Sequence, residues 1–132
     1  MKPVLAEMDV LLAAFSREAR QPAVVRVVVR LIDERRLFMV GWVRQGLLTR
    51  TADNRQFHRL VRALTPFPDV PIQAEDHVIA AQLTCELRQR GAAVQPAQAL
   101  LWCMADRLSC DIYTLEKRWW ALERLGAPLV RF

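Results

Sequence analysis

The chain has 132 residues, of which 53% are hydrophobic and 25% are charged, a composition typical of a folded globular protein rather than of a disordered one. This length supports one hydrophobic core, so we expect a single domain over residues 1–132. The net charge is +5, and nearly all of the positive charge is arginine. Arginine binds phosphate in a planar fork, which is compatible with nucleic acid. An acidic protein partner, or a genome that favours arginine over lysine, explains the charge equally well.

The cysteines argue against a zinc site and against a disulfide framework, because they are odd in number and show no C-x-x-C spacing. They are Cys85, Cys103 and Cys110, and we expect Cys85 and Cys103 to be buried thiols. No window approaches 18 consecutive apolar residues, so we expect no membrane segment. Glu7 and Asp9 interrupt any signal-peptide core. These features together predict a cytoplasmic protein.

Residues 3–15, PVLAEMDVLLAAF, read as a strand, a turn and a helix. Glu7 and Asp9 follow the short apolar run at the carboxyl end of the predicted strand, where ligands bind in open α/β sheets. Carboxylate oxygens suit magnesium or manganese, so the pair is a candidate metal site. The alternative is a solvated turn with an acidic helix start, which is the commoner meaning of this spacing taken alone.

The remaining chain alternates between helices and strands. The stretch AVVRVVVRLIDE is rich in β-branched residues, but its polar positions recur at helical offsets and predict a helix. We expect helices over 9–20, 23–34, 42–48, 53–64, 75–90 and 96–108, and another that begins after Glu116 and stops at Gly126. Predicted strands cover 4–6, 37–40, 70–72, 111–115 and 128–130.

The helix that begins near residue 53 is amphipathic and has a capping-box pattern at its start. Its outer face carries Arg55, Arg59 and Arg62. A charged outer face is the default for a surface helix and needs no function. As a functional surface, however, these three arginines are the best nucleic-acid-binding candidates in the sequence.

The alternation of elements predicts an α/β fold with a central parallel sheet, helices on both faces and right-handed crossovers. The strand over 4–6 and the strand over 111–115 would then end at the same edge of the sheet. We therefore expect Glu7, Asp9 and Glu116 to converge there.

Four segments, in this order and spacing, resemble the PIN domain, and more narrowly the small bacterial toxins of the VapC type. They are LAEMDVLLAAF, LFMVGWVRQGLLTR, EDHVIAAQLTCELRQRG and DIYTLEKRWWAL, and the resemblance covers about residues 4–130. It implies a single PIN-like domain of a magnesium- or manganese-dependent endoribonuclease that is held inactive by an antitoxin. It also implies a homodimer.

The resemblance places four acidic metal ligands at the carboxyl edge of the sheet, and this chain departs from that pattern. The first acid falls on Glu7, and a frequently polar position two residues later falls on Asp9. The second acid falls on Gly46, the third on Gln98 and the fourth on Glu116. Two of the four positions therefore hold an uncharged residue instead of an acid. The other two hold Glu, whose side chain is one methylene longer than that of the family's Asp.

Losing two carboxylates weakens the attraction for a cation, and a ligand shift of about 1 Å can cost roughly a hundredfold in rate. We therefore hypothesise an RNA- or antitoxin-binding module whose nuclease activity is lost or much weakened, with magnesium or manganese as the cofactor if it has one. The alternative is an active ribonuclease with a single metal on Glu7, Asp9 and Glu116, with Gln98 offering its carbonyl oxygen. The four tryptophans fit a core or a dimer interface better than base stacking, and we expect Trp120 to face outward.

Overall fold

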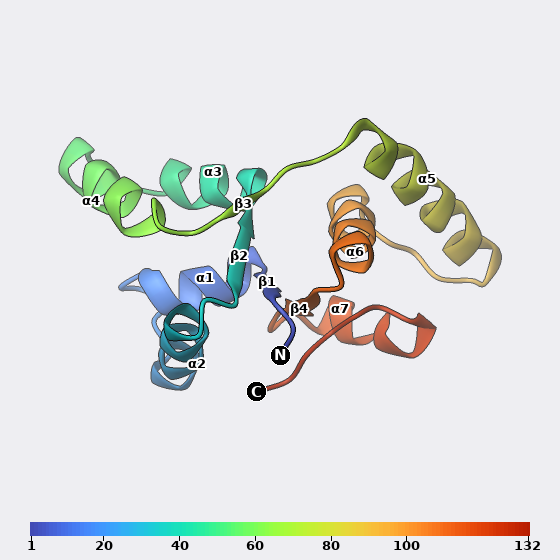
Figure 1. The fold of residues 1–132 in the computed structure, drawn as a ribbon, viewed down its shortest axis with the longest axis horizontal. Helices are drawn as coiled ribbons and strands as arrows, with labels where there is room; N and C mark the ends of the chain where they lie inside the picture. Colours follow the sequence, from blue (N-terminus) through green and yellow to red (C-terminus); the bar gives the residue numbers. More distant parts are fainter.

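The computed structural model describes residues 1–132 and confirms the predicted α/β fold. Four parallel strands form one sheet in the order β3-β2-β1-β4. The strands are β1 (Val4–Ala6), β2 (Leu37–Val40), β3 (Asp69–Val70) and β4 (Asp111–Tyr113). Figure 1 shows helices on both sides of this sheet, with α1 to α4 on one side and α5 to α7 on the other. None of the helices is both long enough and apolar enough to cross a bilayer.

The helices follow the predicted order with shifts at their ends. They are α1 (Met8–Phe15), α2 (Pro22–Asp33), α3 (Gly41–Thr49), α4 (Asn54–Leu64), α5 (Ala74–Gln89), α6 (Pro96–Leu108) and α7 (Lys117–Trp120), followed by the 3-10 helix η1 (Glu123–Leu125). The helix predicted over 23–34 is α2, whose apolar side buries Val24, Val28 and Leu31 against the core. Burial of a helical face therefore outweighs the β-propensity of its valines.

The sheet is short and fully covered. All three residues of β1 are buried, as are three of the four residues of β2, which is the pattern of a parallel sheet with helices on both faces. Val4 pairs with Leu37 on one side and with Asp111 on the other. Around the sheet lies a core of 28 buried residues, in which Trp119 is the largest side chain that is completely buried.

Several boundaries differ from the sequence prediction. Helix α1 stops at Phe15 instead of residue 20, because residues 17–20 are all exposed and offer no large apolar side chain to bury. Strand β4 stops at Tyr113, because the chain then turns to bind Asp9. The strand predicted over 128–130 is only a single bridge between Leu129 and Ile112.

Two side chains also differ from the prediction. The Cys85 thiol is exposed, because it lines the open groove between α5 and α6, whereas Cys103 is buried as predicted. Trp120 is half-buried rather than freely outward, because the guanidinium of Arg131 lies 3.9 Å from the centre of its ring.

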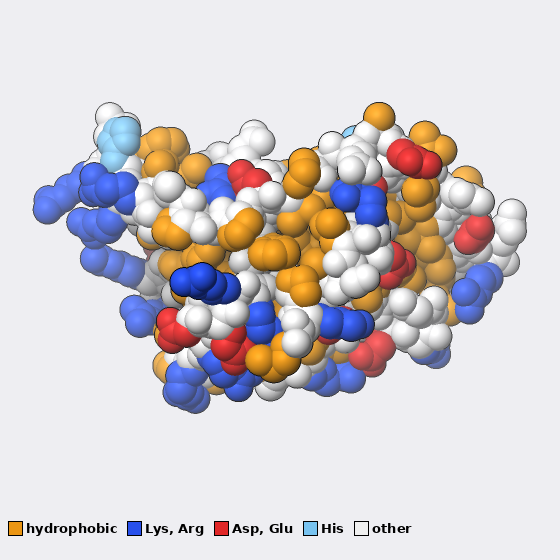
Figure 2. Space-filling model, viewed as in Figure 1, with side chains coloured by type: hydrophobic (Ala, Val, Ile, Leu, Met, Phe, Trp, Pro, Cys, Tyr) orange, Lys and Arg blue, Asp and Glu red, His pale blue; other side chains and the backbone are white.

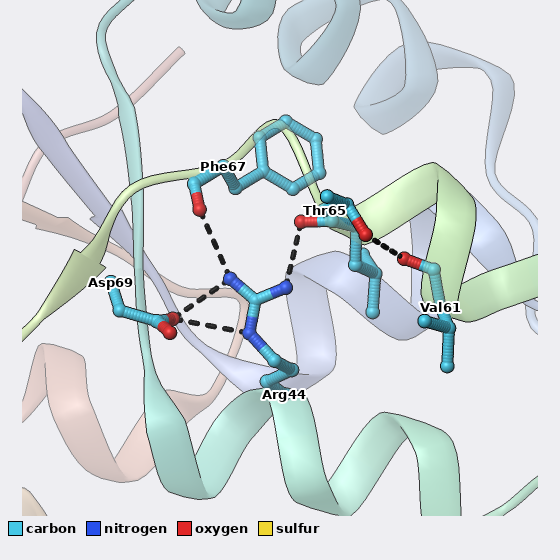
Figure 3. A network of polar contacts seen from close by, with 6 residues as sticks. Arg44, Val61, Thr65, Phe67 and Asp69 are labelled. Carbon is cyan, nitrogen blue, oxygen red and sulfur yellow. Dashed lines mark hydrogen bonds and ion pairs between the residues drawn. The ribbon is translucent and has the colours of Figure 1, made fainter.

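One arginine fixes α3 to the connection between α4 and β3. Arg44 donates to the Asp69 carboxylate at 2.8 and 3.1 Å, to the carbonyl oxygen of Leu64 at 2.7 Å and to that of Phe67 at 3.0 Å (Figure 3). Because the fork spans three acceptors of one loop, it holds the end of α4 in a defined position beside the sheet.

A second arginine holds the helical pair α5 and α6 in place. Arg107 on α6 donates to both carboxylate oxygens of Asp76 at 2.9 Å, and Asp76 is only 1% exposed. The hydrogen bonds from Arg107 lower the pKa of Asp76 below its ordinary value. Asp76 therefore remains charged inside the protein as a structural anchor.

Candidate functional site

The carboxyl ends of β1 and β4 lie side by side, as the sequence predicted. Ala6 pairs with Tyr113, and the Glu7 backbone N–H donates to the Tyr113 carbonyl at 3.0 Å. This pairing brings the segment 7–9 next to the segment 114–116. The negative charges of Asp9 and Glu116 both act on Glu7, so the three acids share one region of the surface.

Glu7 is engaged with the core rather than free in solvent. Its Oε2 atom accepts a hydrogen bond of 2.9 Å from the indole nitrogen of Trp119, which is completely buried. Burial raises the pKa of Glu7 above its ordinary value, and the charges of Asp9 and Glu116 raise it further, while the Trp119 hydrogen bond opposes them. The environment therefore favours the neutral form of this carboxyl group.

Asp9 serves as an acceptor for the chain that leaves β4. Its Oδ2 atom accepts from the hydroxyl group of Thr114 at 3.0 Å and from the backbone N–H of Leu115 at 2.8 Å. Its Oδ1 atom accepts from the backbone N–H of Val10 at 2.7 Å. Thr114 is buried and in turn accepts from the N–H of Glu116 at 3.1 Å. The Asp9 carboxylate is thus used to tie two chain segments together.

Thr114 is a member of this site that sequence reasoning missed. The available signal was a hydroxyl-bearing residue inside the run DIYTLE, directly before the candidate acid Glu116. A buried hydroxyl needs a hydrogen-bond partner. That requirement could have indicated an acceptor at the end of the neighbouring strand.

The other predicted site residues do not complete a metal centre. Glu116 is exposed, and its side chain makes no hydrogen bond at the start of α7. Gln98 lies in the first turn of α6, where its Oε1 atom accepts from the N–H of Gln95 at 3.0 Å. Nowhere in the chain do three His, Cys, Asp or Glu side chains come together as ligands of one ion. The acids share a region, and whether they bind a metal stays a prediction.

The position of the second acid is filled by a side chain from another helix. Gly46 lies within α3, and a Cβ atom added there would overlap the Cε atom of Met8, the first residue of α1. The Met8 thioether therefore occupies the space where a side chain at position 46 would begin. Sequence analysis singled out Gly46 as the position of an expected acid but did not foresee the contact with Met8.

The basic face of α4 lies apart from the acidic region. Arg55, Arg59 and Arg62 are exposed, and none of them forms an ion pair or a hydrogen bond through its side chain. Figure 2 shows the blue side chains that gather at this end of the molecule. Arg55 and Arg59 line a wholly polar cavity of about 290 Å³ together with Arg17, Gln56 and Asp53, and the Asp53 carboxylate accepts from the Gln56 N–H as the cap of α4. Arg17, from the loop after α1, is a further candidate that the sequence pattern did not indicate.

Comparison with solved structures places this fold among toxin–antitoxin proteins. VapBC2 from Rickettsia felis, bound to a DNA fragment from its promoter, matches with a TM-score of 0.75 and 12% identity over 97% of this chain and 96% of that chain. FitAcB from Neisseria gonorrhoeae matches with a TM-score of 0.71 and 17% identity over 91% of this chain and 93% of that chain. A toxin–antitoxin complex from Klebsiella pneumoniae matches with a TM-score of 0.73 and 14% identity over 97% and 96%.

The sequence itself shows no such relationship. No protein-family model matches the chain, and no curated protein matches it. The TM-scores of 0.71 to 0.75 show that the fold is shared, and identities of 12 to 17% do not show a shared activity.

Proposed function

We propose that this protein is a VapC-like PIN-domain module that binds RNA or an antitoxin and whose nuclease activity is lost or much weakened. The observation that carries the proposal is the contact of Met8 with Gly46. The position that should supply one metal ligand has no side chain, and a thioether fills the adjacent space. A thioether is a soft ligand and does not suit magnesium or manganese.

The hydrogen bonds of the remaining acids support the same proposal. The Asp9 carboxylate accepts from Thr114, Leu115 and Val10, and the Glu7 carboxyl accepts from Trp119. Metal-assisted phosphodiester hydrolysis needs carboxylates that are charged and free to coordinate. Here the acid with the most central position is also the one whose pKa is raised by burial.

An RNA-binding role is supported by the α4 face. Arg17, Arg55 and Arg59 surround one polar cavity, and Arg62 continues the same helix. Guanidinium groups without a carboxylate partner are available to bind phosphate oxygens in pairs. Contacts between arginine and phosphate position RNA but carry no sequence information. We therefore propose that the α4 face contacts the RNA backbone rather than particular bases.

A protein partner is supported by apolar surface on α5 and by the structural relatives. Val78 and Ile79 are 68% and 44% exposed, and an apolar groove of about 530 Å³ runs between α5 and α6. Figure 2 shows hydrophobic side chains gathered at this end of the molecule. Patches of this kind mark protein interfaces. The structural relatives are toxin–antitoxin complexes, so we propose an antitoxin as the partner. We also propose that two copies of this chain pair through apolar surface to form a homodimer.

A second candidate function is a weak ribonuclease with one magnesium or manganese ion on Glu7, Asp9 and Glu116. The observation that favours it is the mutual electrostatic effect of these three acids, which lie at the carboxyl ends of β1 and β4. In this candidate, the Asp9 carboxylate must give up the hydrogen bonds that it accepts from Thr114 and Leu115 in order to bind the metal. That exchange would leave a buried hydroxyl without its acceptor.

An RNA cleavage assay with manganese distinguishes the two candidates. The matched control is the double variant Glu7→Gln, Glu116→Gln, which removes both charges and leaves at position 7 an amide oxygen that still accepts from Trp119. The proposed function predicts no manganese-dependent cleavage above that of this variant. Cleavage by the wild-type chain that the variant and EDTA both abolish would support the single-metal nuclease instead.

A further inference from the structure

A second cavity lies where the first turn of α6 meets α7 and η1. Its volume is about 510 Å³, and residues 91–93 of the preceding loop form one wall. Its polar side chains are Gln95, Gln98, Arg118 and Arg124, and no acidic residue lines it. The charged side chains that line the cavity are therefore all positive, although one lining residue, Gln98, stands where the PIN resemblance expects an acid.

The two arginines of this cavity have no partner within the chain. Arg118 and Arg124 are exposed, and neither forms an ion pair or a side-chain hydrogen bond. Arg44 and Arg107, by contrast, use their guanidinium groups on the Asp69 and Asp76 carboxylates. Two unpaired guanidinium groups at one cavity can bind the several oxygens of one anion.

Gln98 adds a third donor that is also unused. The residue is only 8% exposed, and its Oε1 atom accepts from the Gln95 backbone, but its amide nitrogen donates no hydrogen bond. Every fully buried side-chain nitrogen or oxygen in the chain has a partner, so this amide nitrogen is not fully buried, and Gln98 lines the cavity. It lies in the first turn of the 13-residue helix α6, where the helix dipole also favours a negative ligand.

We propose that this cavity binds a phosphate group, carried by a nucleotide or by an RNA strand. Arg118, Arg124 and the Gln98 amide supply donors, and apolar side chains that include Leu122 and Leu125 form a wall for the attached organic part. The volume lies in the range of about 300–1,000 Å³ found for small-molecule sites. Gln98 thus serves as a donor to an anion at the position where the PIN resemblance expects an acid. The proposal depends on neither the loss of nuclease activity nor the α4 face.

The test is calorimetric titration of the full chain with adenosine 5′-monophosphate, with adenosine and with a short single-stranded RNA. We expect binding of the monophosphate and none of adenosine. Gln98→Glu should weaken binding about tenfold or more, roughly the effect of one lost charge-assisted hydrogen bond. The new carboxylate has nearly the same shape and still accepts from the Gln95 N–H, so the fold is retained. The double variant Arg118→Ala, Arg124→Ala should have a larger effect.

The control is the double variant Arg20→Ala, Arg26→Ala, which removes the same charge from exposed arginines that have no partner. It should change the affinity by less than about twofold, as expected for screened charges at a distance. An equal loss in the control, equal binding of adenosine, or no binding of either phosphate ligand up to about 10 mM would overturn the proposal. If only the RNA binds, and binding is lost in the Arg118, Arg124 variant, the phosphate comes from a strand rather than from a free nucleotide.

Discussion

Met8 lies against Gly46, so that the first residue of α1 fills the space in which a side chain on α3 would begin. This contact joins the helix that follows β1 to the helix that follows β2. The neighbouring helix thus packs into the space beside Gly46. An acid restored at position 46 would first have to displace Met8.

The Met8–Gly46 contact predicts a non-additive pair of substitutions. In a Met8→Ala background, Gly46→Ala should stabilise the chain by about 0.5–1 kcal/mol, because glycine weakens a helix interior. In the wild-type background the same change should be less favourable by about 0.5–1.5 kcal/mol, because Met8 must leave its rotamer. Urea unfolding of the four proteins in this cycle measures the coupling.

The control for this cycle is Gly41→Ala, since an added Cβ atom at Gly41 would meet nothing within 4 Å. Its effect should be the same with and without Met8, to within about 0.5 kcal/mol. If Gly46→Ala had the same effect on stability with and without Met8, this result would contradict the packing of Met8 against Gly46.

Asp9 should contribute to stability more than an exposed acid does. Asp9→Ala leaves the buried Thr114 hydroxyl and the Leu115 N–H without their acceptor. The free energy of unfolding should therefore fall by about 1–3 kcal/mol. Glu116→Ala, which removes the same charge from an exposed side chain without a hydrogen bond, should change it by less than about 0.5 kcal/mol. If Asp9→Ala were neutral or stabilising in metal-free buffer, Asp9 would be a free ligand rather than a structural acceptor.

Glu7 should make stability depend on pH in a defined direction. Burial raises the folded-state pKa of Glu7 above its ordinary value of 4.5, so the folded chain holds this proton to higher pH than the unfolded chain. Stability should therefore be lost as the pH rises from about 4.5 through the raised pKa. A glutamine side chain carries no such proton, so the stability of the Glu7→Gln variant relative to wild type should increase from about pH 4 to about pH 7.

Unfolding curves across this pH range test the Glu7 prediction against a matched substitution. Glu86→Gln removes one exposed carboxylate on α5 that has no hydrogen bond or ion pair. The difference between Glu86→Gln and wild type should stay constant with pH. The same pH trend in both variants would show that net charge, rather than the burial of Glu7, is responsible.

The basic face of α4 should bind RNA through its phosphates. Arg55→Ala, Arg59→Ala should weaken binding of single-stranded RNA equally for different base sequences. It should also reduce the slope of log affinity against log salt by about 1 for each arginine that contacts a phosphate. Fluorescence anisotropy over a salt series measures both quantities. Arg26→Ala, Arg90→Ala removes the same charge elsewhere, and an identical loss in that variant would argue against a specific face.

Much of the fold could be predicted from the sequence because its signals are local. The runs 4–6 and 37–40 are short and wholly apolar, which predicts buried strands rather than helices. The polar residues in 23–34 recur at helical spacing and lie on one face, which predicts a helix. Their positions in the structure agree with these patterns. The end of β4 could not be predicted in the same way, because it depends on Asp9, which is 105 residues away from Thr114 in sequence.

The candidate site was predictable in its location but not in its contacts. Convergence of Glu7, Asp9 and Glu116 follows from the parallel order of β1 and β4. The bond from Trp119 to Glu7 and the packing of Met8 on Gly46 depend on how helices meet across the sheet, which no local pattern in one sequence encodes. The Arg118–Arg124 cavity likewise forms only when α6, α7 and η1 are folded together.

The most direct test of the central claim is a calorimetric titration of the purified chain with manganese. We predict no binding up to several millimolar that differs from the Glu7→Gln, Glu116→Gln variant, because Asp9 is occupied by the chain itself and position 46 has no ligand. Binding at micromolar to low millimolar manganese that disappears in this variant would contradict the account. It would show that the acids at the ends of β1 and β4 still hold a metal.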